Sequence, residues 1–233
     1  MIELLVISRV LEYPDADLWQ HQHELHDALA NGKALNLQQA AQLSHFITDL
    51  CHEDLLDAQA SYSELFDRGR ATSLLLFEHV HGESRDRGQA MVNLMGQYQQ
   101  AGMEIDSREL PDHLPLYLEY LSQRDEEEAR SGLQDIAPIL ALLAARLKQR
   151  ESRYAVLFDV LLGLSQSDVA VESVSQQIIG EARDDTPQAL DAVWEEEQVK
   201  FVAEAGCGES EISQHQRRFA GAVAPQYLNI GGQ

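Results

Sequence analysis

Leucine, alanine, glutamate and glutamine fill long windows of this chain at the spacing of amphipathic helices. The alternating β-branched runs that strands need are missing from these windows. Only 14 Gly and 6 Pro occur among 233 residues, so few positions interrupt the helical pattern. Because 44% of the residues are hydrophobic, the chain can bury one substantial core. The sequence therefore predicts an all-α fold, a single globular multi-helix domain.

The carboxyl end has a different composition from the predicted helices. Past Gly206 the helical pattern decays into a stretch with Gly, Ser and Gln, which buries little apolar surface. We therefore expect an all-helical domain over residues 1–205 and a loosely held tail over residues 206–233.

Local signals mark the ends of some predicted helices. Asp15 is an expected helix cap and Gly32 an expected helix stop. The predicted helices are 2–11, 15–29, 35–52, 54–67, 72–101, 115–121, 133–149, 152–164, 169–183 and 186–201.

The charge of the chain limits its partners. Acidic residues outnumber basic ones 39 to 17, which gives a formal net charge of −22 at pH 7. Such a field repels phosphate backbones and anionic lipids, so we expect no nucleic acid partner and no stable membrane association. The most apolar window, residues 136–145, is also shorter than the roughly 20 residues that span a bilayer. A basic peptide or a positively charged protein surface is the partner that this charge favours.

Cysteine spacing and the amino terminus both indicate the cytoplasm. Cys51 and Cys207 lie far apart and form no Cys-x-x-Cys pair, so neither a zinc knuckle nor a disulfide scaffold is predicted. The amino terminus carries Glu3 where a signal peptide has basic residues, and Arg9 interrupts its apolar run. We therefore expect no export signal and a reducing compartment.

A turn held by two prolines precedes the helix expected at residues 115–121. Pro111 and Pro115 lack an N–H group and fix φ, so the chain turns between them and enters a helix at Pro115. Asp112 and His113 are thereby held at the mouth of that helix. The apolar face predicted for this helix consists of Leu114, Tyr117, Leu118 and Leu121.

The Asp112-His113 pair has two interpretations. A carboxylate beside an imidazole can do general acid–base work. In a purely structural turn, the Asp instead caps a helix and the His is a satisfied polar neighbour. Spacing alone favours the structural interpretation, because no nucleophile or metal set surrounds the pair.

The long helix predicted over residues 72–101 has a polar centre at residues 79–88. His81 and Arg85 fall in the apolar row of this helix, at places that a simple core helix fills with leucine. Such a stretch either lines a wet groove or pairs with buried acids, and its two glycines permit close approach of another backbone or a break in the helix. His79 and His81 point about 200° apart on a helix, so we predict no shared metal ion.

Short catalytic signatures are absent from the sequence. It contains no dinucleotide-binding glycine pattern, no P-loop, no Gly-x-Ser-x-Gly elbow and no His-Glu-x-x-His helix. We therefore predict a protein that is not an enzyme and that has no resident cofactor.

Three parts of the chain together resemble the redox-enzyme maturation chaperones of the TorD type, in particular those that assemble respiratory nitrate reductase. They are residues 62–67, the polar centre and the turn at residues 109–113. The resemblance implies an all-helical cytoplasmic protein, absent from the finished reductase, that holds the catalytic (alpha) subunit during molybdenum cofactor insertion. It implies that Glu109, Pro111, Asp112 and His113 lie at a client-peptide site. We expect the same site to include Tyr117, His81, Arg85, Tyr62 and Phe66.

Three functions are compatible with these patterns. A chaperone would receive a basic amphipathic amino-terminal peptide of its client in an acidic, partly apolar groove. An enzyme would use His113 as a base oriented by Asp112, with Glu109 or His81 as an acid. A permanent acidic helical subunit or scaffold of a redox complex is the third alternative. We favour the chaperone.

Overall fold

A computed structural model describes residues 1–80, 85–105, 109–169, 171–192 and 194 of the chain. Within these residues the secondary structure is helical, with one isolated β-bridge, so the predicted all-α class is confirmed. Contacts divide the chain into a compact unit, Met1–Asp185, and a second unit that begins at Thr186. The predicted boundary at residue 205 and the tail after it lie outside the described residues.

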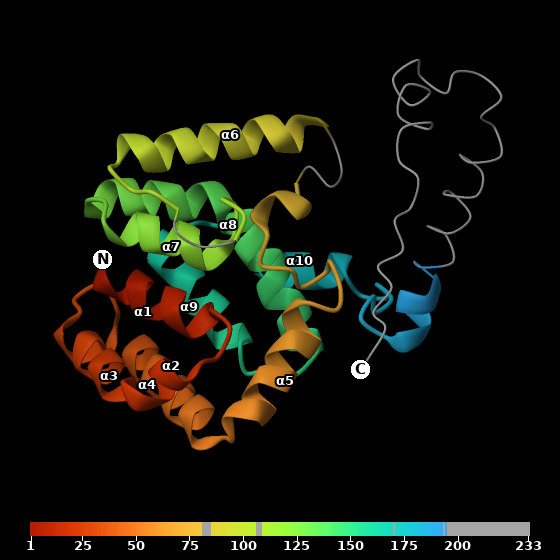
Figure 1. The fold of residues 1–233 in the computed structure, drawn as a ribbon, viewed down its shortest axis with the longest axis horizontal. Coiled ribbons are helices and arrows are strands. Elements are labelled where there is room, and N and C mark those ends of the chain that lie inside the picture. Colours follow the sequence, from red (N-terminus) through yellow and green to blue (C-terminus); the bar gives the residue numbers. More distant parts are fainter. Residues whose placement is uncertain (81–84, 106–108, 170, 193, 195–233) are drawn as a thin grey trace, which may run out of the picture. The chain divides into compact units, whose positions relative to one another are not determined.

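The compact unit is built around its longest helix, α8 (Figure 1). This helix packs against α7, α9 and α10, while α1 packs against α7 and α3, and α4 packs against α3 and α9. The elements are α1 (Ile2–Leu11), α2 (Ala16–Gln20), α3 (Gln22–Asn31), α4 (Leu37–His52), α5 (Leu55–Phe66), the 3-10 turn η1 (Leu76–Glu78), α6 (Arg85–Gln100), α7 (Leu114–Ser122), α8 (Glu126–Gln149), α9 (Ala155–Ser165) and α10 (Val171–Gln177).

Side-chain caps explain where several helices begin. Asp15 accepts the backbone N–H of Leu18 at the start of α2, as its position predicted, and Asp125 caps α8 in the same way. The helix expected over residues 15–29 is nevertheless two helices, which is a correction. Trp19 in α2 donates its indole N–H to the carbonyl of Glu53, 3.1 Å away, and the chain then changes direction to begin α3.

The long helix predicted over residues 72–101 is wrong in its first part. The chain forms an antiparallel bridge there, in which the N–H of Leu76 donates to the carbonyl of Asp112 at 2.9 Å, and the N–H of Leu114 donates to the carbonyl of Leu74 at 2.9 Å. A backbone N–H that is bonded across the chain cannot close a helical turn. Of the alternatives for the polar centre, a break in the helix is confirmed, because residues 79 and 80 form a turn and not a helix.

The helix expected over residues 169–183 is shorter than predicted. Its described part, α10, ends at Gln177, and Gly180 then takes a φ of +93°, which glycine adopts without strain. The next residues pair with side chains of α8. Thr186 starts the second unit as a helix cap, because its hydroxyl accepts the N–H of Ala189 at 3.2 Å.

None of the helices in the described ranges combines the length and the apolar character that crossing a membrane requires.

Candidate functional site

The turn before α7 is built on Asp112, whose side chain is fully buried. One carboxylate oxygen of Asp112 accepts the N–H of Phe77 at 3.0 Å, and its backbone carbonyl accepts the N–H of Leu76. The other carboxylate oxygen has no hydrogen-bond partner among the described residues. Asp112 therefore holds the 73–77 segment against the turn, which supports the structural interpretation of this carboxylate.

Helix α6 secures the turn from another side (Figure 1). Tyr98 is buried on α6, and its hydroxyl donates to the carbonyl of Pro111 at 2.8 Å. The ring of Tyr98 also packs against Tyr120 of α7, with 5.0 Å between the ring centroids. The turn is thus held by two segments that precede it in the sequence, residues 73–77 and α6.

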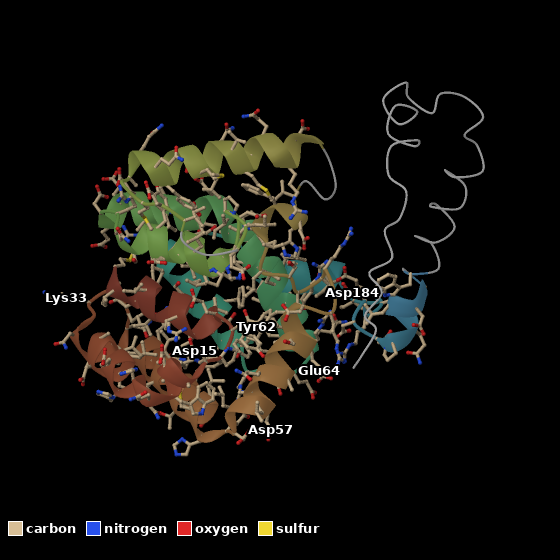
Figure 2. The ribbon with its side chains drawn as sticks, viewed as in Figure 1. Asp15, Lys33, Asp57, Tyr62, Glu64 and Asp184 are labelled. Atoms are coloured by element: carbon tan, nitrogen blue, oxygen red, sulfur yellow. The ribbon has the colours of Figure 1, made fainter. Side chains whose placement is uncertain are left out.

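An aromatic cluster lies beside the carboxyl end of α1. The hydroxyl of Tyr62 donates to the carbonyl of Leu11 at 2.8 Å, and the ring of Tyr62 meets the half-exposed ring of Tyr13 edge-on at 5.6 Å. Phe66 packs between Tyr62 and Tyr154, with centroid distances of 4.8 and 5.1 Å. Figure 2 labels Tyr62 on the side of α5 that faces α1. These rings form an apolar floor that reaches the surface at Tyr13.

Carboxylates gather around His113 and Tyr62. Burial is the main cause that lowers the pKa of His113, and the opposing charges of Glu109, Asp112 and Asp67 do not offset it. The imidazole is therefore neutral at neutral pH. Burial likewise raises the pKa of Tyr62, and the charges of Asp67 and Glu109 raise it further.

Two further carboxylates extend this group across α1 and α7. Burial raises the pKa of Glu12, and the charge of Glu119 on α7 raises it too, while Arg9 lowers it. Arg9 forms ion pairs with Glu12 at 3.2 Å and with Asp15 at 2.5 Å. We define the acidic face as the four carboxylates Glu12, Asp67, Glu109 and Glu119.

The predicted site residues fall into three groups. Glu109 lies close enough to both His113 and Tyr62 for its charge to act on them, so these three belong to one surface region. The others with described side chains are buried: Pro111, Asp112, Phe66 and Tyr117. His81 lies outside the described residues, and of Arg85 only the backbone, at the start of α6, is described.

Tyr117 lies on the inner side of α7. Its hydroxyl donates to the carbonyl of Gly132 on α8 at 3.3 Å. A side chain at Gly132 would come within 2.5 Å of Leu121, so this glycine allows α7 and α8 to approach closely. Tyr117 thus contributes to the helix packing beneath the turn.

Sequence reasoning missed Glu12, Asp67 and Glu119 as members of the site. Asp67 directly follows the aromatic pair Tyr62 and Phe66, and that adjacency was a usable signal. Glu12 and Glu119 come together only because α1 packs on α7, which no local pattern reveals. Across the described part of the chain, no three His, Cys, Asp or Glu side chains are grouped so that they could hold a metal ion.

Carboxylates beside an aromatic cluster are complementary in charge and polarity to a basic, partly apolar surface. Comparison with known proteins gives the family. Residues 15–159 match the nitrate reductase delta subunit family, and the chain belongs to it.

Several relatives share the family. The nitrate reductase molybdenum cofactor assembly chaperone NarJ of Escherichia coli K12 is 69% identical over 235 residues, which cover 100% of both chains. The probable assembly chaperone NarW of the same strain is 55% identical over 97% of this chain and 96% of its own. A probable NarJ of Bacillus subtilis is 32% identical over 74% of this chain and 93% of its own. The resemblance to nitrate reductase assembly chaperones is therefore confirmed.

Proposed function

We propose that this chain is a chaperone specific to respiratory nitrate reductase. It binds the immature catalytic (alpha) subunit and keeps it competent for molybdenum cofactor insertion and membrane assembly. It acts in the cytoplasm and is not part of the finished enzyme. The identity of 69% to an assembly chaperone over the whole chain carries this proposal.

The client segment that we propose is a basic amphipathic peptide at the amino terminus of the catalytic subunit. Its basic side chains pair with the acidic face, and its apolar side packs on the half-exposed side chains of Tyr13 and Leu110. Charge pairing at a solvent-exposed surface is screened by salt, whereas apolar packing is not. Binding therefore weakens with salt without being abolished.

The geometry of the turn supports a role without catalysis. One oxygen of the Asp112 carboxylate accepts a hydrogen bond from the Phe77 backbone and the other has no partner among the described residues, so this carboxylate does not hold the imidazole of His113. The names of the relatives also favour the chaperone over a permanent subunit of the complex.

Calorimetric titration of the full chain with a synthetic peptide copying that amino terminus tests the proposal. We expect a helical bound peptide, a negative heat-capacity change on binding and a dissociation constant that rises with salt. The variant that removes two charges, Asp67→Asn with Glu109→Gln, should bind about tenfold more weakly, because each lost pair contributes about 0.5–1 kcal/mol.

Glu64→Gln is the matched control for this variant. Glu64 lies on the same helix as Tyr62 but about 200° around it, and it pairs with Arg68 at 2.9 Å on the surface (Figure 2). Its loss should leave affinity unchanged. Equal weakening by the control would show a nonspecific charge effect, and no binding at low salt would refute the peptide site.

A further inference from the structure

Two arginines at the carboxyl end of α8 join segments that are far apart in the sequence. Arg146 and Arg150 lie one turn apart, and their side chains are only 15% and 7% exposed. Arg146 donates to the carbonyl of Ala71 at 2.9 Å, and Arg150 donates to the hydroxyl of Thr72 at 2.8 Å. Both arginines therefore hold the loop that follows α5.

The same arginines also hold residues 181–185, which we name the strap. Arg146 donates to Glu181 at 2.9 Å through its Nε, and Arg150 donates to Asp184, also at 2.9 Å. Arg150 forms a second ion pair, with the buried Asp185, at 3.4 Å. The strap is the last segment of the compact unit before Thr186.

Asp184 touches the loop directly as well. Its second carboxylate oxygen accepts the N–H of Ala71 at 2.7 Å. A Cβ placed on Gly69 would come within 2.6 Å of the carboxylate carbon of Asp184, so only glycine fits at this position while the strap is in place. Figure 2 shows Asp184 near the loop that follows α5.

The loop held by the strap leads straight into the segment that supports the turn. Thr72 is fully buried, and its hydroxyl donates to the carbonyl of Leu65 in α5. Four and five residues later, the N–H groups of Leu76 and Phe77 donate to Asp112. Residues 71–77 therefore connect the strap to the turn at the acidic face, with hydrogen bonds to the strap at one end and to Asp112 at the other.

We propose that the strap positions the turn at the acidic face, so that Arg150, Asp184 and Gly69 are positioning residues for client binding. This inference rests on the proposed function, because the strap does not touch the acidic face and affects client binding only through the loop. Peptide binding and strap docking are coupled, because each of them favours the ordered state of the loop that follows α5. Because such coupling is reciprocal, peptide binding also stabilises the docked strap.

Two variants of the full chain test the strap. Gly69→Ala pushes the Asp184 carboxylate away without changing any charge, and Asp184→Ala removes it. Their controls are Gly88→Ala, where an added Cβ meets no atom within 4 Å, and Asp159→Ala, which removes a surface pair with Lys148 at 2.7 Å. Thermal melts confirm that each variant is folded.

Amide hydrogen exchange and peptide titration are the two measurements. We expect exchange at Ala71, Leu76 and Phe77 to accelerate about tenfold in both strap variants, the factor that corresponds to 1.4 kcal/mol. Affinity for the amino-terminal peptide should fall threefold or more, while both controls stay at wild-type values. In the wild-type chain, the peptide should slow exchange at Ala71.

The two measurements separate the strap from the proposed function. Unchanged exchange at Leu76 and Phe77 in the strap variants would overturn the inference. Faster exchange with unchanged peptide affinity would overturn it as well, because the strap would then order a loop that binding does not use. If the wild-type chain binds no peptide, the proposed function fails, and exchange in the variants still decides whether the strap orders the turn.

Discussion

Replacing Asp112 with alanine should destabilise the fold, even though this residue was predicted from the sequence as part of a binding site. Its carboxylate is fully buried and accepts the N–H of Phe77 at 3.0 Å. A hydrogen bond to a charged group contributes about 1.5–3 kcal/mol. The second oxygen is buried without a partner among the described residues, and relief of its desolvation offsets part of that loss. We expect a net loss of about 2 kcal/mol in the free energy of unfolding.

The Asp112→Asn variant should lose less, about 1 kcal/mol, because the amide oxygen still accepts from Phe77. In a chain of this size, 2 kcal/mol lowers the midpoint of thermal unfolding by about 4–8 °C. Urea titration followed by circular dichroism measures the difference directly. Glu109→Gln is the control, since Glu109 is an exposed member of the same turn and should change stability by less than about 0.5 kcal/mol.

We expect the wild type and Glu109→Gln to be equally stable, Asp112→Asn to be less stable, and Asp112→Ala to be the least stable. An Asp112→Ala variant that unfolds at the wild-type urea concentration would refute the conclusion that this carboxylate holds the 73–77 segment. Peptide binding should weaken in the Glu109→Gln variant, because this substitution removes a charge from the acidic face.

Three further outcomes are expected. Leu118→Ala, on the buried face of α7, should lower the free energy of unfolding by about 2–5 kcal/mol, which thermal melting measures. Gly132→Ala should cost about 1–3 kcal/mol in the same assay, since its Cβ would lie 2.5 Å from Leu121. His79 and His113 both have a pKa lowered by burial from 6.5, so the unfolded state binds more protons below that pH and the free energy of unfolding falls with decreasing pH. Replacing both with glutamine should make the midpoint of urea unfolding depend less on pH between pH 7 and pH 5.

Helices with strong local signals were predictable from the sequence. Asp15 caps α2, and the backbone N–H of Gly32 closes the end of α3, as their residue types indicate. The apolar face of α7 is also confirmed, because Leu114 and Leu118 are fully buried. In these cases, the spacing of apolar residues and the caps agree with the tertiary packing.

The 73–77 segment could not be predicted, because a distant residue decides its structure. Leu74 and Leu76 are good helix formers, but hydrogen bonds with Asp112 and Leu114 replace the helical ones. Local propensity is weaker than this network of tertiary hydrogen bonds. A sequence window of ordinary length contains only one side of the pairing.

The site was predicted in part for the same reason. The turn carries a strong local pattern, because Pro111 and Pro115 flank Asp112 and His113. Glu12 and Glu119 belong to no distinctive local pattern, and they become neighbours only through the packing of α1 on α7. The strap is similar, since nothing near Asp184 in the sequence points to Ala71 or Arg150.

The most direct test of the account is a pull-down of the tagged full chain from cells that express nitrate reductase, with and without molybdenum cofactor synthesis. The account predicts that the chain captures the immature catalytic subunit, that capture increases when cofactor synthesis is blocked, and that the mature membrane-bound enzyme lacks the chain. Copurification with the mature enzyme in a fixed ratio would contradict the account and would identify a permanent subunit.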